Sequence, residues 1–203
     1  MKQQNQKITP VNTLVILINV IVFIVLSFIG DTNNAWFMYE HGASEPAAVM
    51  EMHEYWRLFT CMFLHFGFQH LFNNMLVLAF LGDNLERAVG KVRYLLIYLG
   101  SGVLANIVSV MISYNRGRAV VSAGASGAIF GVVGGLMYIL YAHRGFYEDL
   151  SLRRVILFAA LSVYLGFQNS GTDNIAHLGG IVFGLILCTC LYKKRVEKKS
   201  DLW

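Results

Sequence analysis

Six runs of apolar residues follow one another along the chain, separated by polar stretches. The runs cover residues 11–28, 59–81, 94–114, 126–142, 155–167 and 175–192. A helix that crosses a membrane needs roughly 20 mostly apolar residues, so the fifth run is short and is expected to extend over Gln168. The pattern predicts six membrane-spanning helices.

The polar stretches between the runs are expected to be loops. The longest covers residues 31–58 and contains Pro46, and a short charged loop is expected at 83–93. The sequence shows neither internal repeats nor a linker between domains. We therefore expect one core, residues 11–192, with a polar head at 1–10 and a basic tail at 193–203.

Composition agrees with this pattern. The chain has 203 residues, of which 56% are hydrophobic and only 14% are charged. These values are too apolar for a soluble domain, and they favour an all-α polytopic bundle. The three cysteines suggest no disulfide framework. The first run lacks a small-residue cleavage site, so we expect it to remain as a span rather than to be removed as a signal peptide.

The positions of the basic residues predict the topology. Six spans place both termini on one side of the membrane. That side then holds thirteen of the 16 Lys and Arg residues, and only Arg57, Arg116 and Arg118 lie on the other. Because basic residues favour the cytoplasmic side, both termini are expected in the cytoplasm. The same distribution explains the sequence pI of about 9.0 without a nucleic-acid partner. We expect a multi-pass protein of the cell membrane, in a bacterial plasma membrane.

This topology brings three polar side chains to one depth. His70 lies in the outer half of the second run, and Ser126 and His177 lie at the outer ends of the fourth and the sixth. Ionisable groups inside a membrane are costly and usually functional. The shared depth therefore indicates a site just below the outer surface.

Ser126 and His177 have the chemistry of a nucleophile and its base. A serine hydroxyl attacks a carbonyl only when a neighbouring base accepts its proton, and histidine can do this near neutral pH. Taken singly, Ser126 is better explained as a small residue that lets helices approach, and His177 as a buried histidine bonded to a backbone carbonyl. Together, at one depth, they favour a catalytic dyad. Asp173 lies in a loop and is not assigned as a third member.

His70 and Asn74 stand four residues apart and so project from one face of a helix. Acyl transfer needs donors aimed at the developing oxyanion, and these two side chains with the Ser126 N–H are candidates. A polar clamp between helices is the alternative. A metal site at His65, His70 and His177 is a weaker rival, because no carboxylate or cysteine stands nearby at ligand spacing. We expect no metal and no cofactor.

Glycines predict close contact between the fourth and sixth runs. Small residues at four-residue spacing let helix backbones approach in lipid. They recur in this way at Gly127, Gly131 and Gly135, and again at Gly180 and Gly184. Phe130, four residues after Ser126, is expected to pack against the His177 imidazole. The alternative is an aromatic side chain that faces lipid.

The ordered set of motifs resembles the rhomboid family of intramembrane serine proteases. Gly124-Ala125-Ser126-Gly127 resembles the family's G-x-S-G nucleophile motif, and His177 with its trailing glycines resembles the segment of its catalytic histidine. Three further matches are His65/His70/Asn74 (H-x-x-x-x-H-x-x-x-N), Trp56-Arg57 (the Trp-Arg pair of the first external loop) and Gly82/Glu86/Gly90 (G-x-x-x-E-x-x-x-G). The resemblance covers the chain from the first run to the sixth.

The resemblance implies a six-helix core that cleaves membrane segments of other proteins in a cavity open to the outside. Ser126 would be the nucleophile, His177 the base, and His70, Asn74 and the Ser126 N–H the oxyanion donors, with Gly124 and Phe130 in support. Phe130 stands where family members often carry tyrosine. Substrate would enter sideways from the lipid bilayer, past the short fifth run near Tyr164 and Phe167.

Two other functions remain open at this point. A non-catalytic rhomboid-like protein would bind membrane segments for quality control without needing Ser126 and His177. A small transporter, suggested by Asn19, Asn106 and the histidines in apolar runs, would need a polar path across the whole membrane. The sequence leaves the oligomeric state and the substrate open.

Overall fold

The computed structural model describes residues 9–168 and 171–192. The predicted basic tail at 193–203 and all but the end of the predicted head at 1–10 lie outside these residues. The helices and strands are α1 (Pro10–Ile29), α2 (Ala35–Glu40), α3 (Pro46–Met50), α4 (Arg57–Thr60), the 3-10 helix η1 (Cys61–Phe63), α5 (Gly67–Val89), α6 (Lys91–Asn115), α7 (Ser126–Ala142), β1 (Phe146–Tyr147), β2 (Leu150–Ser151), α8 (Leu152–Gln168) and α9 (Asn174–Leu191).

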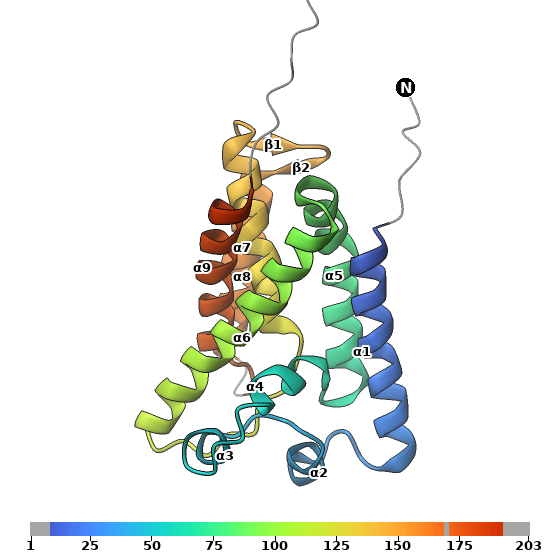
Figure 1. Cartoon of the computed structure of the whole chain (residues 1–203), viewed down its shortest axis with the longest axis vertical. Coiled ribbons are helices and arrows are strands. Elements are labelled where there is room, and N and C mark those ends of the chain that lie inside the picture. The colour runs from blue at the N-terminus through green and yellow to red at the C-terminus, as the bar shows by residue number, and fades with distance from the viewer. Residues whose placement is uncertain (1–8, 169–170, 193–203) are drawn as a thin grey trace, which may run out of the picture.

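Within the described residues, the long helices α1, α5, α6, α7, α8 and α9 form a bundle around α7 (Figure 1). Val132, Val133 and Leu136 in the middle of α7 are fully buried, because α5, α6, α8 and α9 all pack against this helix. The β1–β2 hairpin lies at the same end of the bundle as the start of α1, and the short helices α2, α3 and α4 lie at the opposite end (Figure 1). The bundle thus has two distinct ends, one with the hairpin and one with the short helices.

The outer surface of the bundle is apolar, as expected for a protein in lipid. Three of the described helices, α1, α6 and α9, are long and apolar enough to cross a membrane, and α7 is a shorter apolar helix. Large apolar side chains stand exposed on α1, among them Leu14, Ile21 and Phe28. In water such a surface would be costly, whereas lipid tails cover it without cost.

The predicted boundaries of the second span and its following loop are wrong. The run at 59–81 predicted one span, but α5 begins only at Gly67, where φ is +68°, and residues 57–63 form α4 and η1. The predicted charged loop at 83–93 is helical except at Gly90, which ends α5 with a φ of +87°. A left-handed φ of this kind favours glycine.

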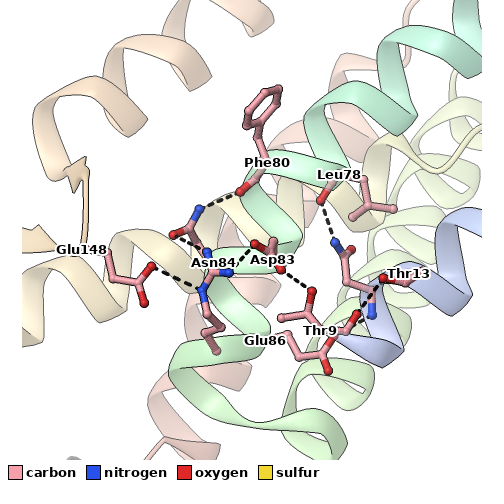
Figure 2. A network of polar contacts seen from close by, with 10 residues as sticks. Thr9, Thr13, Leu78, Phe80, Asp83, Asn84, Glu86 and Glu148 are labelled. Carbon is pink, nitrogen blue, oxygen red and sulfur yellow. Dashed lines mark hydrogen bonds and ion pairs between the residues drawn. The ribbon is translucent and has the colours of Figure 1, made fainter. Parts of the chain in front are cut away.

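Polar contacts explain why α5 runs through the charged segment (Figure 2). The Thr9 hydroxyl donates to Asp83, and two N–H groups in the first turn of α1 donate to the buried Glu86 carboxylate at 3.2 and 2.6 Å. Arg87 pairs with Asp83 and, at 3.3 Å, with Glu148 of the hairpin. The acidic side chains of α5 thus stabilise the positive end of α1. Because these carboxylates have partners, the charged segment can remain helical and does not form the predicted loop.

Two further details differ from the sequence-based expectation. The all-α prediction omits the two-stranded hairpin, in which Phe146 pairs with Ser151. The expected loop at 31–58 contains two short helices, α2 and α3, and the start of a third, α4. Asn34 and Glu45 explain α2 and α3, because each side chain accepts a hydrogen bond from the first turn of the helix that follows it.

Candidate active site

A cavity of about 1010 Å³ lies between α5, α6, α7, α8 and α9, towards the end of the bundle that carries α3. Polar side chains from several helices line it, which suits a site that must hold water within a membrane protein. All six residues predicted for catalysis or its support line this cavity: His70, Asn74, Gly124, Ser126, Phe130 and His177.

Ser126 and His177 are held by a close seam between α7 and α9. An ideal Cβ added to Gly180 would lie 2.2 Å from the Gly127 carbonyl oxygen, and one added to Gly184 would lie 1.9 Å from that of Gly131. Both pairs advance by four residues in the same direction, so the two helices run parallel. Ser126 directly precedes one of the paired glycines, and His177 lies one turn before Gly180.

The predicted glycines do not all act alike. A Cβ on Gly131 would lie 1.7 Å from the Ser101 hydroxyl oxygen of α6. Gly131 therefore permits close contact both with α6, at Ser101, and with α9, at Gly184. A Cβ on Gly127 would make only ordinary contacts, at 3.6 Å with Ala105 and 3.7 Å with Ala176. It is therefore the carbonyl of Gly127, rather than its missing side chain, that makes the close contact.

Phe130 stacks on the His177 imidazole. The ring centroids lie 4.2 Å apart and the planes are inclined by 22°. Phe130 is only 6% exposed, so the alternative of a lipid-facing aromatic is wrong. Among the described residues, the buried Nδ1 of His177 has no hydrogen-bond partner. Among the described residues, the Phe130 ring rather than a hydrogen bond at Nδ1 thus restricts the rotation of the His177 imidazole.

His70 and Asn74 lie against the backbone just before Ser126. An ideal Cβ on Gly124 would lie 2.8 Å from Cε1 and 2.9 Å from Nε2 of His70, and 3.7 Å from Nδ2 of Asn74. The φ of Gly124 is +145°, so a side chain here would be strained as well as crowded. Nδ2 of Asn74 is buried and, within the part of the chain that the structure describes, donates no hydrogen bond.

Comparison with known proteins decides the family. The Rhomboid domain matches residues 52–194. The chain belongs to the rhomboid family. It is 35% identical over 178 residues to "Rhomboid protease GluP" of Bacillus subtilis, covering 88% of this chain and 34% of that protein. It is 37% identical over 145 residues to "Putative rhomboid protease YdcA" of the same organism, covering 70% of each.

A plant relative extends the comparison. "RHOMBOID-like protein 1" of Arabidopsis thaliana is 38% identical over 148 residues, covering 72% of this chain and 37% of that protein. The chain thus spans about a third of the length of GluP and of the plant relative. Both Bacillus relatives are named rhomboid proteases, and the long apolar helices of this chain are those of a membrane protein.

His65 supports the loop that carries the serine of this rhomboid. Its Nε2 accepts a hydrogen bond from the Ala125 N–H at 3.4 Å, and the Gly124 N–H donates to the Cys61 carbonyl at 2.9 Å. The His65 ring stands edge-on to that of His70, with centroids 5.1 Å apart. No group of three or more His, Cys, Asp or Glu residues placed for a metal occurs at 9–168 and 171–192, so the rival metal site gains no support.

Asp173 has a structural role that the sequence analysis missed. Its carboxylate accepts hydrogen bonds from the Ala176 N–H at 2.9 Å, the Ser109 hydroxyl at 2.6 Å and the Ser122 hydroxyl at 3.3 Å. It thereby caps α9 and ties that helix to α6 and to the loop before Ser126. An aspartate directly before an apolar helix is a typical N-cap, and this signal was present in the sequence.

The two residues predicted near a substrate gate, Tyr164 and Phe167, differ in their placement. Phe167 of α8 lines the cavity together with Phe158 and Leu165, whereas Tyr164 is 59% exposed and does not line it. The two asparagines that suggested a transporter also separate. Asn106 lines the cavity, but Asn19 donates to the Val15 carbonyl within α1 and does not line it. Asn19 therefore shares no path with Asn106, whereas His70 and His177 line the same cavity as Asn106.

Proposed function

We propose that this rhomboid is an intramembrane serine endopeptidase that hydrolyses peptide bonds in or near membrane-spanning segments of other proteins. The observation that carries the proposal is the placement of Ser126 and His177 on two helices in backbone contact, with both side chains in one cavity. The proteases among its relatives support the same reaction class.

In this mechanism the Ser126 hydroxyl oxygen attacks the scissile carbonyl while its proton passes to the His177 imidazole. The carbonyl oxygen becomes an oxyanion. As the tetrahedral intermediate collapses, His177 gives the proton to the leaving amine and the peptide C–N bond breaks. Water then attacks the acyl-enzyme with His177 again as base, which frees the new carboxylate and restores Ser126.

The oxyanion would be held by His70, Asn74 and the Ser126 N–H. Three facts support this role. Nδ2 of Asn74 has no hydrogen-bond partner among the described residues, His70 lies against Gly124, and α7 begins at Ser126. The first N–H groups of a helix are unpaired and carry partial positive charge, so they favour an anion. Phe130, stacked on His177, would hold the base in its productive orientation.

We further propose that α1, α5, α6, α7, α8 and α9 are the six spans of a single core at 11–192. The polar head at 1–10 and the basic tail at 193–203 would then lie in the cytoplasm. Arg87 and Arg153 mark the cytoplasmic end, and Arg116 marks the outer end. The active site would open to the outer side of a bacterial plasma membrane. A cysteine at either end, probed with an impermeant thiol reagent, tests this topology.

The substrates would be membrane-spanning proteins that reach the cavity sideways from the bilayer. Phe158, Leu165 and Phe167 line the cavity on the α8 side. Their apolar side chains suit the approach of a helix from lipid, while the polar interior suits an unwound segment whose carbonyls are exposed. Segments with small or helix-breaking residues near the outer boundary are therefore expected to be cleaved best.

The alternative is a rhomboid-like protein that binds membrane segments without cleaving them. A fluorophosphonate, which reacts only with an activated serine, separates the two. We expect one adduct on the peptide that contains Ser126, and none on Ser126→Ala, on His177→Ala or on denatured protein. Equal labelling of native and denatured protein would favour the non-catalytic reading.

A further inference from the structure

The outer mouth of the cavity carries two arginines that the mechanism does not use. Arg116 and Arg118 line the cavity, and both are exposed. None of the ion pairs found at residues 9–168 and 171–192 involves either of them. Two guanidinium groups thus stand at the rim of the site without an acidic partner.

Among the described residues that line the same cavity, Asp173 has the one carboxylate, and it forms no ion pair with either arginine. Its oxygens accept hydrogen bonds from Ser109, Ser122 and the Ala176 N–H, and it lies at the positive end of α9. Glu51, which accepts a hydrogen bond from the Tyr114 hydroxyl at 3.0 Å, does not line the cavity. The rim therefore keeps a net positive charge.

The backbone holds the two arginines in a fixed turn. The Arg116 N–H donates to the Ile112 and Ser113 carbonyls at the end of α6, and the Arg118 N–H donates to Ser113 at 3.0 Å. Gly117 between them has a φ of +62°, which lets the chain reverse within one residue. The arginines thus belong to a turn built on α6, and this turn holds their backbone beside the cavity.

We propose that Arg116 and Arg118 select substrates that carry an acidic side chain on the outer flank of the scissile bond. The inference rests on the proposed protease function, because it places an extended substrate in the cavity that Ser126 shares with these arginines. Arginine guanidinium groups match carboxylates in geometry and charge. A basic residue at the same place would meet two like charges and would be disfavoured.

An acidic peptide fits this rim better than a lipid phosphate does. The arginines share their cavity with Gln69, Asn73 and Ser113, which are polar and suit a hydrated peptide. Phosphate groups of the outer leaflet remain the competing source of negative charge. The experiment therefore varies substrate charge and lipid charge separately.

The test uses the full-length protein in phosphatidylcholine vesicles and a single-span reporter substrate. One residue on the outer flank of the cleaved bond is Asp, Asn or Lys in otherwise identical reporters. For the wild type we expect kcat/KM to fall by about tenfold from Asp to Lys, with Asn between them, and the ratio to shrink as salt is added. Arg116→Glu combined with Arg118→Glu should invert the order, so that Lys is cleaved faster than Asp.

The Asn reporter keeps the two proposals distinguishable. Each ratio is measured within one preparation, so a poorly folded variant changes all rates and leaves the ratio intact. The control variant combines Arg153→Gln with Arg154→Gln, at the start of α8, and should retain the wild-type preference. Arg116→Gln combined with Arg118→Gln should abolish that preference. If the arginine variants cleave Asn reporter in a Ser126-dependent way and still prefer Asp, the arginines do not read substrate charge.

Two other outcomes also overturn the inference. If the wild type cleaves none of the reporters, the protease function itself fails. If the preference follows the fraction of phosphatidylglycerol in the vesicles instead of the reporter residue, Arg116 and Arg118 bind lipid headgroups.

Discussion

Gly184 lies where α9 touches the backbone of α7, so one added methyl group tests whether this seam holds the site. An ideal Cβ on Gly184 would lie 1.9 Å from O, 2.5 Å from C and 2.6 Å from Cα of Gly131. All three are backbone atoms of a helix and cannot rotate away as a side chain would. Gly184→Ala must therefore separate α7 from α9.

The size of the effect follows from these distances. Real Cβ atoms come no closer than 3.0 Å, so 1.9 Å is about 1.1 Å too short. Overpacking of a helix interface typically costs about 1–3 kcal/mol, and a gap of this size removes a quarter to a half of the dispersion energy of each contact. Alanine is also about 1 kcal/mol more favourable than glycine inside a helix, which offsets part of this cost. We expect Gly184→Ala to lower the free energy of unfolding by about 2 kcal/mol.

The same displacement should impair catalysis, because Ser126 and His177 lie on the two helices that move apart. A misplacement of about 1 Å can cost about 100-fold in rate. We therefore expect kcat of Gly184→Ala to fall by about that factor under conditions where the variant is still folded.

Gly100→Ala in α6 is the matched control. Its Cβ would meet one atom within 4 Å, the Cδ1 of Leu187 at 3.1 Å, which is the end of a flexible side chain. Chemical unfolding in detergent micelles and reporter cleavage should show Gly100→Ala close to the wild type. If Gly184→Ala also unfolds and cleaves like the wild type, the seam does not hold the site and the reasoning is wrong.

Substitutions at three further positions test other parts of the structure. Glu86→Gln removes the charge of a buried carboxylate that accepts hydrogen bonds from two N–H groups of α1. We expect the free energy of unfolding to fall by about 1–3 kcal/mol, measured by thermal melts. An unchanged melting temperature would contradict a capping role for Glu86. Asn74→Ala should lower kcat by about 10²–10³ with little change in KM, whereas a rise in KM alone would assign Asn74 to binding. Phe130→Leu should lower kcat by about tenfold, because the stack on His177 is lost, whereas Phe130→Tyr should retain the rate. Equal rates for the two variants would show that the aromatic ring does not orient His177.

Where a span could be predicted well, its sequence was uniformly apolar and bounded by turn residues. The run at 126–142 coincides with α7, and the first, third and sixth runs match α1, α6 and α9 to within about three residues at each end. Such helices are specified locally, by periodicity and by the need to satisfy backbone groups in lipid.

The ends of α5 could not be predicted in the same way, because they depend on tertiary contacts. Asp83, Glu86 and Arg87 look like loop residues until Thr9 and the start of α1 supply partners for them. At the other end, the apolar residues 59–66 look like part of a span. They instead form α4, η1 and a short extended segment that supports the loop before Ser126.

The site was predictable to a similar degree. Spacing and common depth were enough to select Ser126, His177, His70 and Asn74, which the structure places in one cavity. Spacing could not reveal that His65 bonds the Ala125 N–H, because that contact joins segments about sixty residues apart. The sequence also could not show that Arg116 and Arg118 line the cavity.

The most direct test of the proposed activity is cleavage of a single-span reporter by purified protein in liposomes. The wild type is compared with Ser126→Ala and His177→Ala, each first checked for a native melting temperature. We predict one cleavage site near the outer membrane boundary for the wild type and none for either variant. Equal cleavage by all three proteins, or binding without cleavage by the wild type over a varied reporter panel, would contradict the proposed Ser126–His177 dyad.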